Sequence, residues 1–195
     1  MAGYTRVEGE EEDSQILVTV DQNKVMFYSE VTNESCLKLI QCLDKAKKHV
    51  AVHNAVSNIG DQMHVFLHIC SCGGDVYAAL SVIDTILAST VGIVTVCEGC
   101  VASAAALIAL AGTRRLIRKH AYMLIHEIRS VCAGRYSECQ DDMRNSEALM
   151  AAMQSYISER CANAKLDRKL EGFLKHDRIW NGKKCLKYGL VDSIL

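Results

Sequence analysis

A run of small residues from Gly99 to Ala106 follows a hydrophobic stretch from Val91 to Cys97 and most constrains how this chain folds. Small side chains let the backbone turn sharply and let a helix pack closely against a strand. The run therefore predicts a junction between a buried strand and a helix, with Ser103 at the turn. A serine there suits a nucleophile, but Ala, Ser and Cys also suit a helix that is simply buried. On this segment alone, packing is the better interpretation.

Strands and helices alternate along the rest of the chain. The hydrophobic spacing predicts strands at 16–20, 24–31, 63–69, 91–97, 114–117 and 122–125, and helices at 33–49, 76–87, 102–111 and 137–165. Asn33 is the expected N-cap of the first helix, and the polar segment from Ala51 to Asp61 is expected to be a surface loop. Repeated strand–helix–strand units predict an α/β fold whose sheet is largely covered by helices.

Composition limits the classes of protein to which the chain can belong. It has 195 residues, of which 50% are hydrophobic, and a formal net charge of −1. We expect an acidic N-terminal segment at 1–15 and one domain at 16–195, and neither disorder nor nucleic-acid binding. There is no apolar stretch long enough for a membrane span and no signal-peptide pattern, so a cytoplasmic protein is expected.

The chain contains ten cysteines, which we expect to be reduced in such a compartment. Two closely spaced pairs, together with nearby histidines, would suit a zinc site: Cys97 and Cys100, Cys70 and Cys72, His64 and His68. Cysteine also serves as a small buried apolar residue, and this interpretation is favoured here. We therefore expect no metal and no cofactor.

Two further segments complement Ser103. Gly73 and Gly74 form a turn between a strand and a helix, where backbone amides can hold a negative oxygen. His126 follows the strand at 122–125 and is a candidate base for the serine hydroxyl. A carboxylate that holds the histidine would complete the set. The residues alone leave six candidates for it: Asp75, Glu127, Asp141, Asp142, Asp167 and Asp177.

Five collinear segments resemble the proteolytic subunit of the caseinolytic (Clp) protease family, over about Lys24 to Leu195. They are residues 69–74, 99–104, 123–126, 176–178 and 188–195. The resemblance implies a Clp/crotonase-like α/β fold of repeated β-β-α units, with a long handle helix at about 137–165.

The resemblance also implies a serine-type endopeptidase that works through an acyl-enzyme. Ser103 would be the nucleophile, His126 the general base and then acid, and Asp177 the orienting carboxylate. The amides of Gly74 and Ala104 would form the oxyanion hole. Subunits of the family assemble into stacked heptameric rings, a homo-oligomeric tetradecamer, and a separate AAA+ unfoldase feeds them. This chain has no Walker-type motif, so any ATP use would belong to that partner.

The sequence departs from the family pattern at three places. Cys72 stands where the family has proline, and Glu127 and Ile128 stand where it has a polar residue and proline. The Glu127 carboxylate would either stabilise a charged His126 or point into solvent. The axial-loop sequence is not recognisable in residues 1–13, and the chain has no proline at all.

These departures keep alternatives open. They fit a viral member of the family that processes structural proteins. The related crotonase fold suggests an enzyme acting on acyl-coenzyme A, although that chemistry needs no serine, histidine and aspartate triad. A non-catalytic ring subunit is the remaining alternative, but such subunits typically lose members of the triad.

Overall fold

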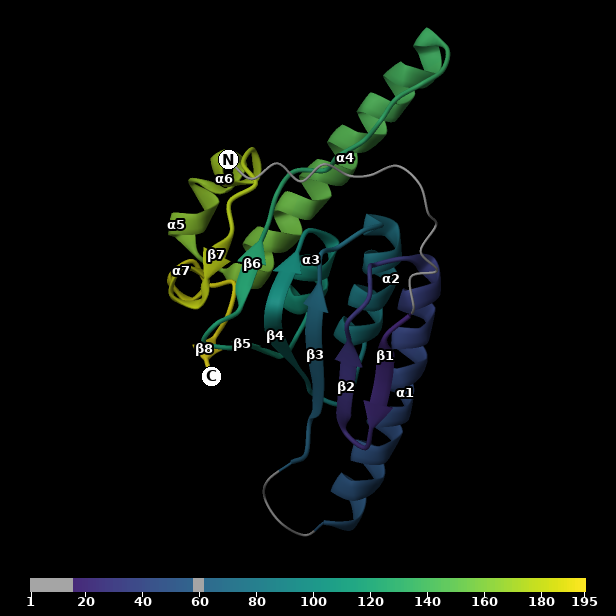
Figure 1. Ribbon diagram of the computed structural model, residues 1–195, viewed down its shortest axis with the longest axis vertical. Helices are drawn as coiled ribbons and strands as arrows, with labels where there is room; N and C mark the ends of the chain where they lie inside the picture. The colour runs from purple at the N-terminus through teal and green to yellow at the C-terminus, as the bar shows by residue number, and fades with distance from the viewer. Residues whose placement is uncertain (1–15, 58–61) are drawn as a thin grey trace.

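The computed structural model of the chain describes residues 16–57 and 62–195 (Figure 1). In this part of the chain one eight-stranded sheet runs in the order β1-β2-β3-β4-β5-β8, with β6 and β7 branching from β4. Its strands are β1 (Val18–Asp21), β2 (Lys24–Phe27), β3 (Val65–Ser71), β4 (Ile93–Ala102), β5 (Arg114–Ile117), β6 (Tyr122–Leu124), β7 (Trp180–Asn181) and β8 (Ser193–Ile194). The pairs β1–β2 and β6–β7 are antiparallel, and the other pairs are parallel.

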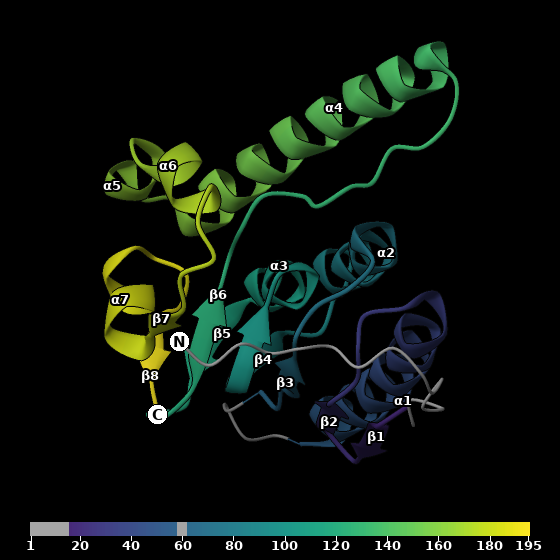
Figure 2. The ribbon, with the colours of Figure 1, turned by 45° about the horizontal axis from the view of Figure 1, so that its top comes forward.

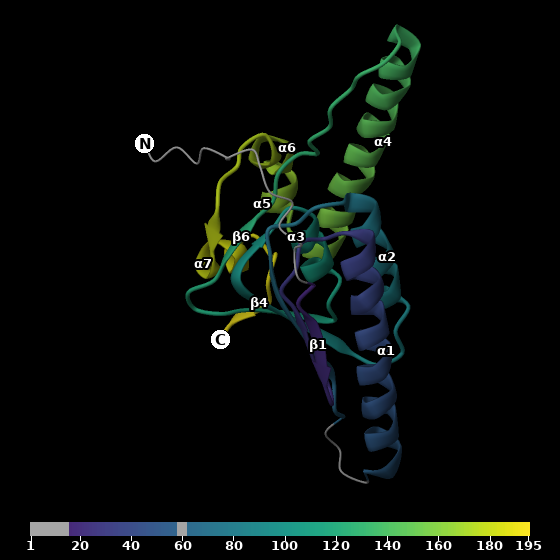
Figure 3. The same ribbon diagram turned by 45° about the vertical axis from the view of Figure 1, so that its right-hand side comes forward.

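Three helices, α1 (Asn33–Val56), α2 (Val76–Leu87) and α3 (Ala104–Leu110), lie along one face of this sheet. The described residues also form α4 (Tyr136–Cys161), α5 (Ala164–Asp167), α6 (Leu170–Leu174) and α7 (Gly182–Lys187), of which α7 packs beside β6, β7 and β8. Figures 2 and 3 show α1, α2 and α3 side by side along that face, with α4 beyond α3. The core lies between these layers, and its largest fully buried side chains include Phe27, Leu67, Ile69 and Ile108. The α/β fold with a long helix is confirmed.

The first helix differs from its prediction at both ends. Its N-cap is Thr32 rather than Asn33, because Thr32 and Ser35 exchange side-chain-to-backbone hydrogen bonds of 3.0 and 3.1 Å in a capping box. At the other end α1 continues to Val56, well into the segment expected to be a loop. Its buried side chains reach Val50, so packing against the sheet carries the helix past the residue at which the apolar pattern weakens.

The strand before Ser103 is longer than expected. β4 runs through Ala102, so Gly99 to Ala102 are strand residues, and α3 begins at Ala104 rather than at Ala102. The extra length pairs with β6, where Val101 lies opposite Met123 and Ala102 opposite Leu124. Small residues give no clear hydrophobic alternation, so the sequence pattern does not indicate that the strand continues through them. Their backbone nevertheless forms the same hydrogen bonds in the sheet as that of larger residues.

The long helix expected at 137–165 is α4, which spans Tyr136–Cys161. It ends four residues early, because Ala162 adopts a left-handed conformation (φ 44°). Its buried residues, Met153, Ile157 and Cys161, all lie in its second half, and its first half projects beyond the sheet (Figure 1).

The acidic segment at 1–15, together with 58–61 of the expected loop, lies outside the described residues. None of the helices in the described ranges is long and apolar enough to span a membrane.

Candidate active site

Ser103 lies at the junction of β4 and α3 in an unusual backbone conformation, with φ 56° and ψ −128°. Positive φ values are uncommon for residues other than glycine and cluster at functional sites. The Ser103 amide donates to the Leu124 carbonyl of β6 over 2.9 Å. This hydrogen bond fixes the serine relative to β6, and His126 follows only two residues after Leu124.

The glycine turn packs directly against this junction. Gly73 is buried and has φ +97°, and a Cβ at that position would lie 2.6 Å from Ser103 Cβ and 3.1 Å from the Ala104 nitrogen. Gly74 has φ +143°, and its Cβ would lie 2.2 Å from the Val31 carbonyl oxygen. Both the backbone angles and the close approach therefore require glycine here.

The amides of Gly74 and Ala104 are both available. The hydrogen bonds among the described residues use the Gly73 carbonyl and the Asp75 amide on either side of Gly74, but neither of the two predicted oxyanion donors. Ala104 is the first residue of α3, where a backbone amide has no acceptor within the helix. Two unused donors thus flank Ser103.

His126 and Asp177 form an ion-pair contact, with His126 Nδ1 3.0 Å from Asp177 Oδ1. The His126 side chain is only 11% exposed, whereas that of Asp177 is 51% exposed. Asp177 lies in the irregular segment between α6 and β7. Leu174, the last residue of α6, accepts a 2.8 Å hydrogen bond from the Glu127 amide, so the end of α6 is joined to the segment after β6. The second carboxylate oxygen of Asp177 contacts Arg129.

A pocket of about 490 Å³ brings the predicted residues together. Ser103 and His126 line it together with Gly74 and Ala104, and Asp177 joins the group through His126. Among the described residues, no hydrogen bond links the Ser103 hydroxyl to the His126 ring. The rest of the lining is mixed: its apolar residues are Val76, Leu107, Ile125, Ile128, Leu149, Met153 and Ile157, and its charged residues are Asp75, Glu127 and Arg129.

The other carboxylates that the sequence left open have different surroundings. Asp75 is the N-cap of α2 and accepts a 2.8 Å hydrogen bond from the Ala78 amide. Asp141 pairs with Arg144 on the exposed half of α4. Glu127 is exposed and forms no ion pair with His126 within the described ranges. Of the six candidates, Asp177 is the one in contact with the histidine.

The cysteine and histidine pairs at zinc-like spacing do not converge. No group of three or more His, Cys, Asp or Glu residues in 16–57 and 62–195 could hold a metal ion. His68 instead contacts Glu98, with 2.9 Å between Nδ1 and Oε1. Cys97 is fully buried, and burial strongly raises the pKa of its thiol.

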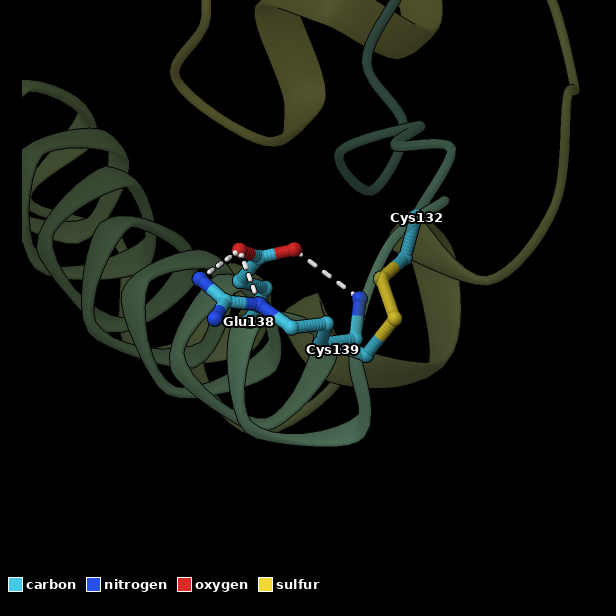
Figure 4. Close-up of a disulfide and its surroundings, with 4 residues drawn as sticks. Cys132, Glu138 and Cys139 are labelled. Atoms are coloured by element: carbon cyan, nitrogen blue, oxygen red, sulfur yellow. Dashed lines mark hydrogen bonds and ion pairs between the residues drawn. A yellow bond between two sulfur atoms is a disulfide. The ribbon is translucent and has the colours of Figure 1, made fainter.

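The expectation that every cysteine is reduced is wrong at one place. Cys132 and Cys139 form a disulfide, with their Cα atoms 5.7 Å apart (Figure 4). Cys132 lies in the loop after β6 and Cys139 in the first turn of α4, so the chain reverses direction between them. The other eight cysteines are free. Neither this bond nor the contact of Arg129 with Asp177 has a signal in the sequence, because each depends on how an irregular loop folds back.

The chain is similar to proteins of one family. The model of the family described as Clp protease matches residues 12–195. The chain is 27% identical over 172 residues to the ATP-dependent Clp protease proteolytic subunit 2 of Synechococcus sp. (strain CC9605), covering 86% of each chain. It is 32% identical over 135 residues to proteolytic subunit 1 of the same protease from Tropheryma whipplei (strain Twist), covering 67% of this chain and 64% of the relative.

Proposed function

Because this chain belongs to the Clp protease family, we propose that it is a serine endopeptidase with Ser103 as nucleophile, His126 as base and Asp177 as orienting carboxylate. One observation carries the proposal. The histidine paired with Asp177 lines the same pocket as a serine with positive φ and two unused backbone amides. A histidine or a serine that served only in packing would need neither the paired carboxylate nor the two unused amides.

The proposed reaction follows from this arrangement. With Nδ1 of His126 held by Asp177, the other ring nitrogen takes the proton of Ser103 as the hydroxyl oxygen attacks a peptide carbonyl. Asp177 stabilises the imidazolium that forms, and His126 then gives the proton to the leaving amine. Water then attacks the acyl-enzyme, with His126 again acting first as base and then as acid, and the second product is released.

The amides of Gly74 and Ala104 stabilise the negative oxygen that develops in each step. Loss of one such donor costs serine proteases on the order of 10²–10³ in rate. The absence of a bond between Ser103 and His126 in the described residues is compatible with this role, because catalytic hydrogen bonds often tighten only when substrate binds.

We propose that the chain also assembles as its family implies, into stacked heptameric rings served by a separate unfoldase ATPase in the cytoplasm. The exposed half of α4 supports the first part, since Tyr136 and Met143 are 80% and 65% exposed there and suit a contact between subunits. The names of the relatives, which describe an ATP-dependent protease, support the second.

Labelling with a fluorophosphonate, which reacts with activated serines, tests the catalytic proposal. We expect rapid labelling of the wild type and none of Ser103→Ala. Ser146→Ala is the matched control because Ser146 lines the same pocket, and it should be labelled like the wild type. Equal labelling of the wild type and Ser103→Ala would sink the proposal.

Two further measurements separate the alternatives. Hydrolysis of short fluorogenic peptides by the purified chain would exclude a non-catalytic ring subunit. Saturable binding of a coenzyme A thioester, without labelling of Ser103, would favour the crotonase-type enzyme instead.

A further inference from the structure

The two oxygens of the Asp177 carboxylate have different partners. Oδ1 meets Nδ1 of His126 at 3.0 Å, and Oδ2 contacts Nη2 of Arg129. Arg129 follows His126 by three residues, so one short loop supplies both partners. The carboxylate is therefore held on both sides by the segment that carries the proposed base.

Asp177 has little else to fix its orientation. Its side chain is 51% exposed, and the hydrogen bonds and ion pairs among the described residues give its carboxylate no other partner than His126 and Arg129. A half-exposed carboxylate with one contact can rotate about its terminal torsion, because that torsion is broad. A second contact at the other oxygen sets the plane of the group.

We propose that Arg129 is a positioning residue for the reaction, which holds the Asp177 carboxylate in the plane that meets His126. The inference rests on the proposed peptidase function. A guanidinium suits this task because it is planar and remains charged at any working pH. Its charge also opposes the stabilisation of a protonated His126, but the Arg129 side chain is 73% exposed, so solvent screens this effect. Orientation therefore outweighs charge.

The loop that carries Arg129 is fixed on both sides of it. Just before Arg129, the Glu127 amide donates to Leu174 over 2.8 Å, and just after it the Cys132–Cys139 disulfide ties the loop to α4 (Figure 4). Arg129 thus lies between two anchors, which lowers the entropic cost of holding its side chain on Asp177.

Steady-state kinetics with a fluorogenic peptide test this role in the full chain. We expect Arg129→Gln to lower kcat and the rate of fluorophosphonate labelling about fivefold, the size of effect of an exposed ion pair, with KM unchanged. Arg129→Lys should recover part of the loss, because an ammonium makes one contact but no planar fork. Arg135→Gln is the matched control: it removes an arginine of the same loop that pairs with Glu138 instead.

The Asp177→Asn background shows whether Arg129 acts through the carboxylate. There, Arg129→Gln should have no further effect on kcat. The inference is overturned if Arg129→Gln matches the wild type, if Arg135→Gln loses as much, or if the fivefold loss persists beside Asp177→Asn. A wild type that is not labelled at Ser103 would instead overturn the peptidase proposal, and the role of Arg129 with it.

Discussion

The two sides of the pocket are built in different ways. The nucleophile side consists of Gly73, Gly74, Ser103 and Ala104, all at ends of β3, β4 and their helices, and held by backbone hydrogen bonds and tight packing. The base side consists of His126, Arg129 and Asp177, all in irregular segments after β6 and α6, and held by contacts between side chains.

The difference indicates which part of the site can change its geometry. On the nucleophile side any shift of Ser103 must break the sheet register or the contact with Gly73. On the base side a rotation of one exposed carboxylate is enough to change the contact with His126. Alignment of the proposed triad is therefore set by the base side, on a scaffold that the nucleophile side keeps fixed.

Substitution of the carboxylate should have the largest effect on activity and almost none on stability. We expect Asp177→Asn to lower kcat by up to about 10⁴, the loss typical when a serine protease triad loses this charge. The melting temperature should be unchanged, because the Asp177 side chain is half exposed and is not part of the hydrophobic core. Peptide hydrolysis and thermal denaturation of the same preparation measure both. A loss below tenfold would mean that the base side does not work through this carboxylate.

Gly73→Ala should damage activity and stability together, as expected for the nucleophile side. A Cβ there would lie 2.7 Å from the Ala102 carbonyl oxygen as well as against Ser103, in a backbone with φ +97°. We expect a loss of about 10²–10³ in kcat from the disturbed oxyanion site and a destabilisation of about 1–3 kcal/mol.

Gly172→Ala is the control for this substitution. Gly172 lies in α6, and nothing is within 4 Å of a Cβ placed there. It should leave activity intact and stabilise the helix slightly. If urea unfolding and kinetics gave the two variants the same values, the rigidity assigned to the nucleophile side would be wrong.

Glu98 offers a pH-dependent test of that rigidity. It lies in β4 and accepts hydrogen bonds from Tyr28, from His68 (2.9 Å) and from Arg118 (3.0 Å), which connect β2, β3 and the end of β5. Burial raises the pKa of Glu98, but these hydrogen bonds outweigh it and lower the pKa to about 2. Folding therefore stabilises the ionised form of Glu98 relative to its protonated form.

The resulting stabilisation is present above the unfolded pKa, near 4.5, and is lost as the pH falls towards about 2. We expect Glu98→Gln to reduce the free energy of unfolding at pH 7 by about 1–3 kcal/mol, with a difference from wild type that shrinks on acidification through this window. Denaturant unfolding over a pH series measures it. Glu171→Gln removes an exposed ion pair with Lys175 that also lowers the pKa of the Glu171 carboxyl, so it should show the same trend at a much smaller size. A flat Glu98→Gln difference would contradict the prediction.

The same contrast explains what the sequence could predict. Local patterns, such as a glycine pair after a strand and a serine among small residues, identify the nucleophile side, because consecutive residues form its turns. They do not choose among six carboxylates, and only the resemblance to a family points to Asp177. Arg129 and the Cys132–Cys139 bond escaped prediction altogether, since loop residues meet their partners only through the path of the folded chain.

Removal of the disulfide should have the smallest effect on kcat. It measures how far the contact of Arg129 with Asp177 depends on the anchoring of the loop. Cys132→Ser leaves the Glu127–Leu174 hydrogen bond and the Arg129–Asp177 contact possible, but it frees the far end of the loop. We expect a loss of about twofold in kcat, less than that of an exposed ion pair, because one of two anchors remains. Reduction of the wild type should reproduce it in the same assay.

Cys72→Ser is the matched control, as an exposed free cysteine next to Gly73 on the nucleophile side. Reductant should not change the activity of Cys132→Ser, but it should lower that of Cys72→Ser as it does the wild type. If reductant left the wild type unaffected, the Glu127 anchor alone would be sufficient to hold Arg129 on Asp177. If reductant lowered the kcat of the wild type as much as Arg129→Gln does, the whole effect of Arg129 would depend on the disulfide. The base side would then respond to redox conditions, whereas the nucleophile side would not.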